Sequence, residues 1–160
     1  MNAASEKGTL PYLPSDADLT DELVSLIDRL RRKGYGPITE EFDLALEGTA
    51  NGFMEHLARH LLCEERILFP ALREADPSSA GVFDGLQVEH SHLRREAELL
   101  AEHVRSGKGK PALSQGRDFL ATLFDHVHRE AEAIRLVATK MSPEAALRLK
   151  DLLESEERDR

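Results

Sequence analysis

Residues 54–72, MEHLARHLLCEERILFPAL, place two polar side chains on an otherwise apolar surface. Apolar residues recur every three or four positions along this stretch, which predicts an α-helix with one buried face. At about 100° per residue, Glu64 falls at the centre of that face and His60 falls within it. Because a buried carboxylate without a partner is costly, this stretch predicts a partner for Glu64 inside the fold.

The spacing H-x-x-x-E occurs four times in the chain, as His60/Glu64, His92/Glu96, His126/Glu130 and His128/Glu132. A spacing of four residues stacks two side chains on one helix face, so both can reach a single metal centre. In helical projection only the first and third pairs face the core, and a fifth candidate, His90, lies on the flank of an apolar stripe. These residues predict a metal cation in the core, since a cation neutralises carboxylates and binds neutral imidazole nitrogen.

Four long amphipathic segments, each with an apolar stripe, account for most of the chain. No stretch alternates with the period of a β-strand. Short links join the segments, which predicts an all-α fold, an up-down four-helix bundle. Gly48 and Gly52 weaken the second segment and could break it there, because glycine is a poor helix former. The segments lie at residues 15–34, 37–75, 79–105 and 111–140.

The two ends of the chain are expected to lie outside the bundle. Proline residues interrupt the N-terminal region, so residues 1–14 predict a flexible arm ahead of the bundle at residues 15–140. Ser142 as a cap and Pro143 at the first helical position predict a short fifth helix. Residues 141–160 would then form a C-terminal helix with a frayed, charged tail.

Composition excludes several classes of partner. The 160-residue chain carries a net charge of -9, which argues against binding nucleic acid or an anionic membrane surface. No apolar run approaches the roughly 18 residues of a transmembrane span, and we expect no signal peptide. The single cysteine, Cys63, cannot form an intrachain disulfide. Together these features predict a single-domain, cytoplasmic protein.

Three segments together resemble the hemerythrin-like (HHE cation-binding) domain family. HLLCEERILFP at residues 60–70 resembles the family signature H-x-x-x-E-E-x-x-L-F-P. VEHSHL at residues 88–93 resembles the segment that opens the third helix of the family, and HVHRE at residues 126–130 resembles the H-x-x-x-E of the fourth. The resemblance covers residues 15–140.

The resemblance implies a non-haem iron centre, usually di-iron, held inside the bundle. Glu64 and Glu130 would be the carboxylates that bridge the two irons. The terminal ligands would be His60, His90 and His126.

The chain departs from the family pattern at two positions. The family has a histidine near the start of its first helix, where this chain has Thr20 in the matching register. Its oxygen carriers have a further histidine on the third helix, where this chain has Arg94. We therefore expect a weaker second iron site, with Asp16 or His56 as additional ligands, and no simple reversible oxygen carriage. Zinc and a metal-free network of buried polar residues are the alternatives to iron.

Three classes of function are compatible with this pattern. We expect a non-enzymatic metal-binding protein, without catalytic residues, that senses, scavenges or buffers oxygen, nitric oxide or iron. The first alternative is an iron-dependent enzyme that decomposes peroxide or delivers iron. The second is a degenerate, metal-free helical scaffold. A small gaseous ligand or a metal ion is the expected partner, and the C-terminal helix could support a homodimer or bind another protein.

Overall fold

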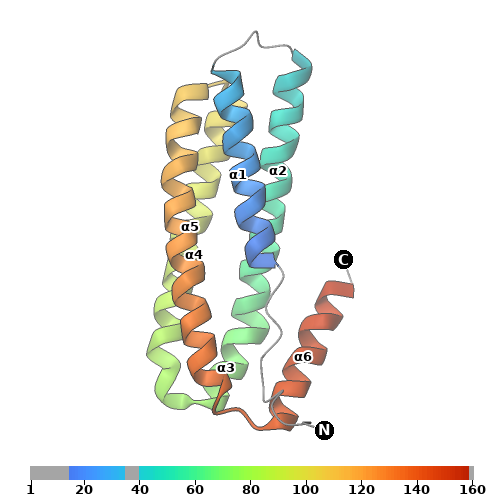
Figure 1. Cartoon of the computed structure of the whole chain (residues 1–160), viewed down its shortest axis with the longest axis vertical. Coiled ribbons are helices and arrows are strands. Elements are labelled where there is room, and N and C mark those ends of the chain that lie inside the picture. Colours follow the sequence, from blue (N-terminus) through green and yellow to red (C-terminus); the bar gives the residue numbers. More distant parts are fainter. Residues whose placement is uncertain (1–14, 35–39, 159–160) are drawn as a thin grey trace, which may run out of the picture.

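The structure, a computed structural model, describes residues 15–34 and 40–158, and this part of the chain contains helices and no strand. The arm expected at residues 1–14 lies outside the described residues. Figure 1 shows long helical rods side by side and the last helix beside them. The α-helices are α1 (Ser15–Lys33), α2 (Glu40–Cys63), α3 (Phe69–Ala75), α4 (Ala80–Arg105), α5 (Gly109–Ala138) and α6 (Pro143–Arg158).

The rods form the up-down bundle that the periodicity predicted. α2 and α3 continue one another through a π-helical turn at Glu64–Leu68 and together make the second rod (Figure 1). Around the bundle, α1 packs against α2 and α5, and α4 packs against the same two helices. At the end of α4, Gly107 adopts a φ of 67°, and the N–H groups of Gly107 and Lys108 donate to the carbonyls of Val104 and His103. This cap ends α4 sharply and directs the chain into α5.

Two apolar clusters fill the bundle at different levels along the helix axes. The first joins α1 and α2 to the second half of α4 and the first half of α5, and the rings of Phe53 and Phe119 meet there at 5.7 Å. The second joins α3 and α6 to the start of α4 and the end of α5, and it contains Phe69 and Phe83 at 5.3 Å. In chain order, Glu64, His90, His126 and Glu130 fall between buried residues of the two clusters, and His60 stands directly before Leu61 of the first cluster.

The second rod is irregular at a different place from the one considered above. α2 runs unbroken through Gly48 and Gly52, so no break occurs there. The regular helix gives way at Glu64, whose carbonyl accepts a hydrogen bond from the N–H of Phe69, five residues on. Pro70 comes next in the chain, and proline disfavours a regular turn because it lacks an N–H and clashes with the carbonyl four residues earlier. The wider turn changes the rotation of α3 about the rod axis, and the residues buried beyond Glu64 are Leu68, Phe69 and Leu72.

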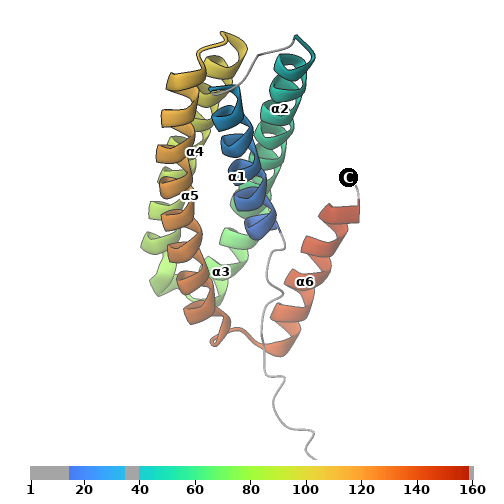
Figure 2. The same cartoon turned by 45° about the horizontal axis from the view of Figure 1, so that its top comes forward.

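The last helix, α6, lies beside the lower part of the bundle (Figures 1 and 2), and in Figure 1 it lies below the start of α1. Its start is capped as predicted, since Oγ of Ser142 accepts a hydrogen bond from the N–H of Ala145 at 3.2 Å. Leu149 and Leu153 are buried in the second apolar cluster. α6 therefore covers a part of the bundle that lies beyond the start of α1.

Candidate metal centre

The five residues predicted to bind metal are all buried inside the bundle. His60 lies near the end of α2, and Glu64 opens the π-helical turn. His90 lies in α4, and His126 and Glu130 lie in α5. None of the five is more than 5% exposed. Side chains from three rods therefore meet in the layer between the two apolar clusters.

Four of these residues lie very close together. Glu64, His90, His126 and Glu130 each offer one ligand atom, and these atoms all lie within 4.8 Å of one another. The imidazole rings of His90 and His126 meet at 69°, with their centres 4.9 Å apart. His60 joins this group through Glu64, because its Nε2 lies 2.6 Å from Oε1 of that carboxylate. These five residues are referred to below as the buried cluster.

The ligand atoms of the buried cluster point toward one another. Nε2 of His90 lies 3.3 Å from Oε2 of Glu64, and Nε2 of His126 lies 3.2 Å from Oε2 of Glu130. Among the described residues, neither oxygen of Glu64 and neither of these two nitrogens makes a hydrogen bond of good geometry. Buried polar atoms are normally hydrogen-bonded, and imidazole nitrogen with carboxylate oxygen is a donor set that suits iron and similar metals. The residues therefore fit a bound cation.

Two further carboxylates contact the cluster histidines on the side away from the cluster. Oε1 of Glu65 lies 2.9 Å from Nδ1 of His90, and Oε2 of Glu89 lies 2.8 Å from Nδ1 of His126. The sequence did not identify either residue, because helical projection places Glu65 outside the apolar face. Both residues stand inside the segments that resemble the family, Glu65 as the second E of H-x-x-x-E-E and Glu89 as the E of VEHSHL, directly beside Glu64 and His90.

Both of these outer carboxylates are paired with arginine. Nη1 of Arg94 lies 2.8 Å from Oε1 of Glu65, and Nη1 of Arg129 lies 2.5 Å from Oε1 of Glu89. Burial would raise the pKa of Glu65, but hydrogen bonds with Arg94 and His90 lower it below its ordinary value. Arg94, which stands where the oxygen carriers have a histidine, is therefore paired with the carboxylate of Glu65.

The pKa values of the two central histidines are shifted in opposite directions. Burial lowers the pKa of His90 to about 4, although Glu65 acts against this effect. Burial would also lower the pKa of His126, but the neighbouring carboxylates of Glu130 and Glu89 outweigh it and raise the pKa above its ordinary value. At neutral pH, His90 is therefore a neutral imidazole, which is the form that binds metal.

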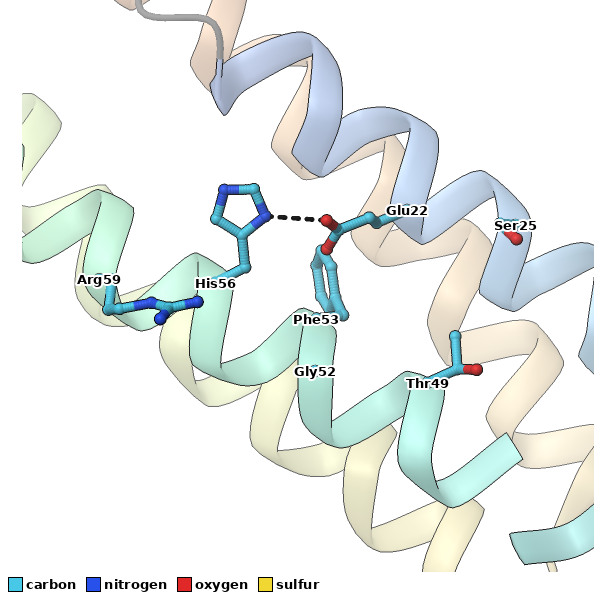
Figure 3. Close-up of a pocket in the computed structure, with 7 residues that line it drawn as sticks. All are labelled: Glu22, Ser25, Thr49, Gly52, Phe53, His56 and Arg59. Carbon is cyan, nitrogen blue, oxygen red and sulfur yellow. Dashed lines mark hydrogen bonds and ion pairs between the residues drawn. The ribbon is translucent and has the colours of Figure 1, made fainter. Parts of the chain in front are cut away.

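His56, one of the two additional ligands considered from the sequence, is not among the residues that converge. His56 is 18% exposed, and its Nδ1 lies 2.9 Å from Oε1 of Glu22 at a surface pocket between α1 and α2 (Figure 3). The side chain of Asp16 lies outside the described part of the structure. His92 and His128, from the other two H-x-x-x-E pairs, are exposed as predicted.

A helical bundle with histidine and glutamate gathered in its core defines a candidate cation-binding protein. The chain matches the sequence model of the hemerythrin HHE cation binding domain over residues 18–134. It therefore belongs to this family, as the resemblance of its motifs predicted. Comparisons with curated proteins and with solved structures found no match. None of the described helices combines the length and apolar character needed to cross a membrane.

Proposed function

We propose that this protein binds non-haem iron in the buried cluster, with two ions at full loading, and that it senses, scavenges or buffers oxygen, nitric oxide or iron. The observation that supports this most is the convergence of four buried residues whose ligand atoms lie within 4.8 Å of one another. The chain belongs to a cation-binding family. Without a cation, these buried polar atoms would destabilise the fold, because burial removes them from water without replacing its hydrogen bonds.

Each residue of the buried cluster would have its own part in holding iron. Glu64 presents one oxygen to His60 and the other to His90, so its carboxylate would join ligands from two rods. Glu130 would supply the second carboxylate, beside His126. Bound iron would supply a redox-active centre able to coordinate a small ligand. The apolar clusters on either side would limit the access of water to it.

The second ion would be held more weakly than the first. Thr20 stands in the register where the family has a histidine, and it is half-buried on α1. A hydroxyl is a poorer ligand for iron than an imidazole. His56 is already paired with Glu22, so we do not include it among the ligands. This difference between the sites is the reason that we do not propose simple reversible oxygen carriage.

Metal analysis of two matched variants tests this proposal. Protein purified without a histidine tag from iron-supplemented cells should contain iron, up to two ions per chain. Glu130→Ala should abolish iron binding, because Glu130 is 1% exposed and faces the other ligands. Glu132→Ala, two residues along the same helix but exposed, should leave the iron content unchanged. Wild-type protein without iron would contradict the proposal, and it would favour the metal-free scaffold.

A further inference from the structure

His90 lies between two carboxylates that contact it unequally. Its Nδ1 is 2.9 Å from Oε1 of Glu65, with good hydrogen-bond geometry. Its Nε2 is 3.3 Å from Oε2 of Glu64, without such geometry. The contact on the side away from the buried cluster is therefore the true hydrogen bond, which places the single proton of the neutral ring on Nδ1.

His126 repeats this asymmetry on the neighbouring helix. Its Nδ1 is 2.8 Å from Oε2 of Glu89, with good geometry, and its Nε2 is 3.2 Å from Oε2 of Glu130, without it. The two outer carboxylates come from different rods, Glu65 from the π-helical turn and Glu89 from α4. The same arrangement is thus built twice from independent elements.

This arrangement decides which nitrogen can bind a metal. A neutral imidazole has one N–H and one lone pair, and an ionised carboxylate can only accept a hydrogen bond. A carboxylate at Nδ1 therefore keeps the proton there and leaves the lone pair on Nε2. In metal sites, such carboxylates fix the tautomer and orientation of the ligating histidine and make it a stronger ligand.

The two outer carboxylates are themselves held in place by cations. Arg94 contacts the Glu65 oxygen that also accepts from His90, and Arg129 contacts the Glu89 oxygen that His126 does not use. A guanidinium can only donate, so the carboxylate oxygen that it contacts acts as the acceptor. In each case a row of polar contacts therefore runs from an arginine through a carboxylate to a histidine of the buried cluster.

We infer that Glu65 and Glu89 are positioning residues, which hold His90 and His126 by Nδ1 so that Nε2 of each ring is aimed at the metal. This inference rests on the proposed function, because it assigns a task to residues that do not touch the metal themselves. It also explains why Arg94 is compatible with a metal site: its charge is directed to Glu65.

The chain offers a matched control for this inference. Glu22 and His56 form the same kind of contact, carboxylate to Nδ1, at 2.9 Å (Figure 3). That pair lies between α1 and α2 and is not part of the buried cluster. Glu22→Gln therefore removes the same charge from the same kind of pair without touching a proposed ligand.

Anaerobic titration with Fe²⁺ is the first test. Glu65→Gln and Glu89→Gln should each weaken Fe²⁺ binding by about 10- to 100-fold, as loss of such partners does in other metal sites. Glu22→Gln should bind Fe²⁺ as the wild type does. Wild-type affinity in both cluster variants would overturn the inference while leaving the proposed function intact. Failure of the wild type to bind Fe²⁺ would instead overturn the proposed function, and the inference with it.

The second test reads the tautomer in metal-free protein and distinguishes positioning from packing. At pH 8, ¹⁵N NMR of the wild type should show the ring proton of His90 on Nδ1. In Glu65→Gln the amide can donate as well as accept, so the fraction with the proton on Nε2 should increase. An unchanged His90 tautomer in Glu65→Gln would overturn the inference. The inference would also be overturned if the variants lost Fe²⁺ affinity only in proportion to a lower melting temperature of the metal-free protein, because the residues would then act through packing.

Discussion

Nε2 of His60 lies 2.6 Å from Oε1 of Glu64, one helical turn further along the same rod, and both side chains are buried. The other oxygen of the same carboxylate faces Nε2 of His90 at 3.3 Å. Glu64 therefore connects a histidine of its own rod with a histidine of α4. Its place at the first residue of the π-helical turn sets the position of both contacts.

Replacement of Glu64 should remove metal binding. Glu64→Ala deletes the carboxylate that two cluster histidines share, so elemental analysis should find no iron in the purified variant. Glu55→Ala, on the exposed face of α2, is the control and should keep the wild-type iron content. Iron retained in Glu64→Ala would show that the metal is held elsewhere.

Introduction of a histidine on α1 should strengthen the weaker site. Thr20 occupies the register of the family's first-helix ligand and is half-buried. In Thr20→His an imidazole would replace a hydroxyl, so the iron content per chain should rise toward two. An unchanged iron content would contradict either the register of α1 or the presence of a second site.

The stability of the metal-free protein should depend on pH through two histidines with opposite signs. The pKa of His90 falls from 6.5 to about 4 on folding, so the unfolded state binds more protons between these values. Stability should therefore fall as pH falls through this range, by at most about 1.4 kcal/mol per pH unit. The pKa of His126 rises above 6.5, so its contribution is complete below 6.5 and is lost as pH rises through the folded value.

Urea unfolding of metal-free wild type, His90→Gln and His126→Gln from pH 5 to 9 measures both effects. His90→Gln should remove part of the fall in stability on the acid side. His126→Gln should remove part of the fall on the alkaline side. Identical pH profiles for the three proteins would contradict the environments described for these rings.

The last helix should stabilise the bundle through one of its faces. Leu149 is 2% exposed and belongs to the second apolar cluster, whereas Leu147 is 59% exposed. Leu149→Ala should lower the free energy of unfolding by about 2 kcal/mol or more, as for other buried leucines. Leu147→Ala should change it little, and chemical denaturation compares the two. Equal effects would mean that α6 does not pack on the bundle as described.

The helical periodicity was sufficient to predict the bundle, and it was insufficient to locate the irregular turn. Apolar stripes report which face of a helix is buried, and they also give the number and order of the helices. Gly48 and Gly52 carry only a modest cost in an exposed position, and α2 continues through both. The π-helical turn begins at Glu64, six residues before Pro70, and the apolar pattern continues through it without a break.

The candidate site likewise contains residues that the sequence could predict and residues that it could not. His60, Glu64, His90, His126 and Glu130 could be predicted, because buried polar residues disturb an apolar stripe. The roles of Glu65 and Glu89 could not be predicted from the apolar stripes, because each is half-buried and its contact is with a histidine of another rod. The pairing of His56 with Glu22 likewise joins residues 34 positions apart in the chain. Such contacts depend on the rotation of neighbouring rods, which a single sequence does not give.

A bound metal should stabilise this polar core, and thermal unfolding with and without iron from pH 5 to 8 tests this most directly. Iron binds the folded state, so it should raise the melting temperature near neutral pH, with about 2.7 kcal/mol added at 100 times the dissociation constant. The gain should shrink toward pH 5, because ligation requires deprotonated histidine and carboxylate groups, and protons compete for them. Coincident melting curves for iron-loaded and metal-free protein across this range would contradict the account.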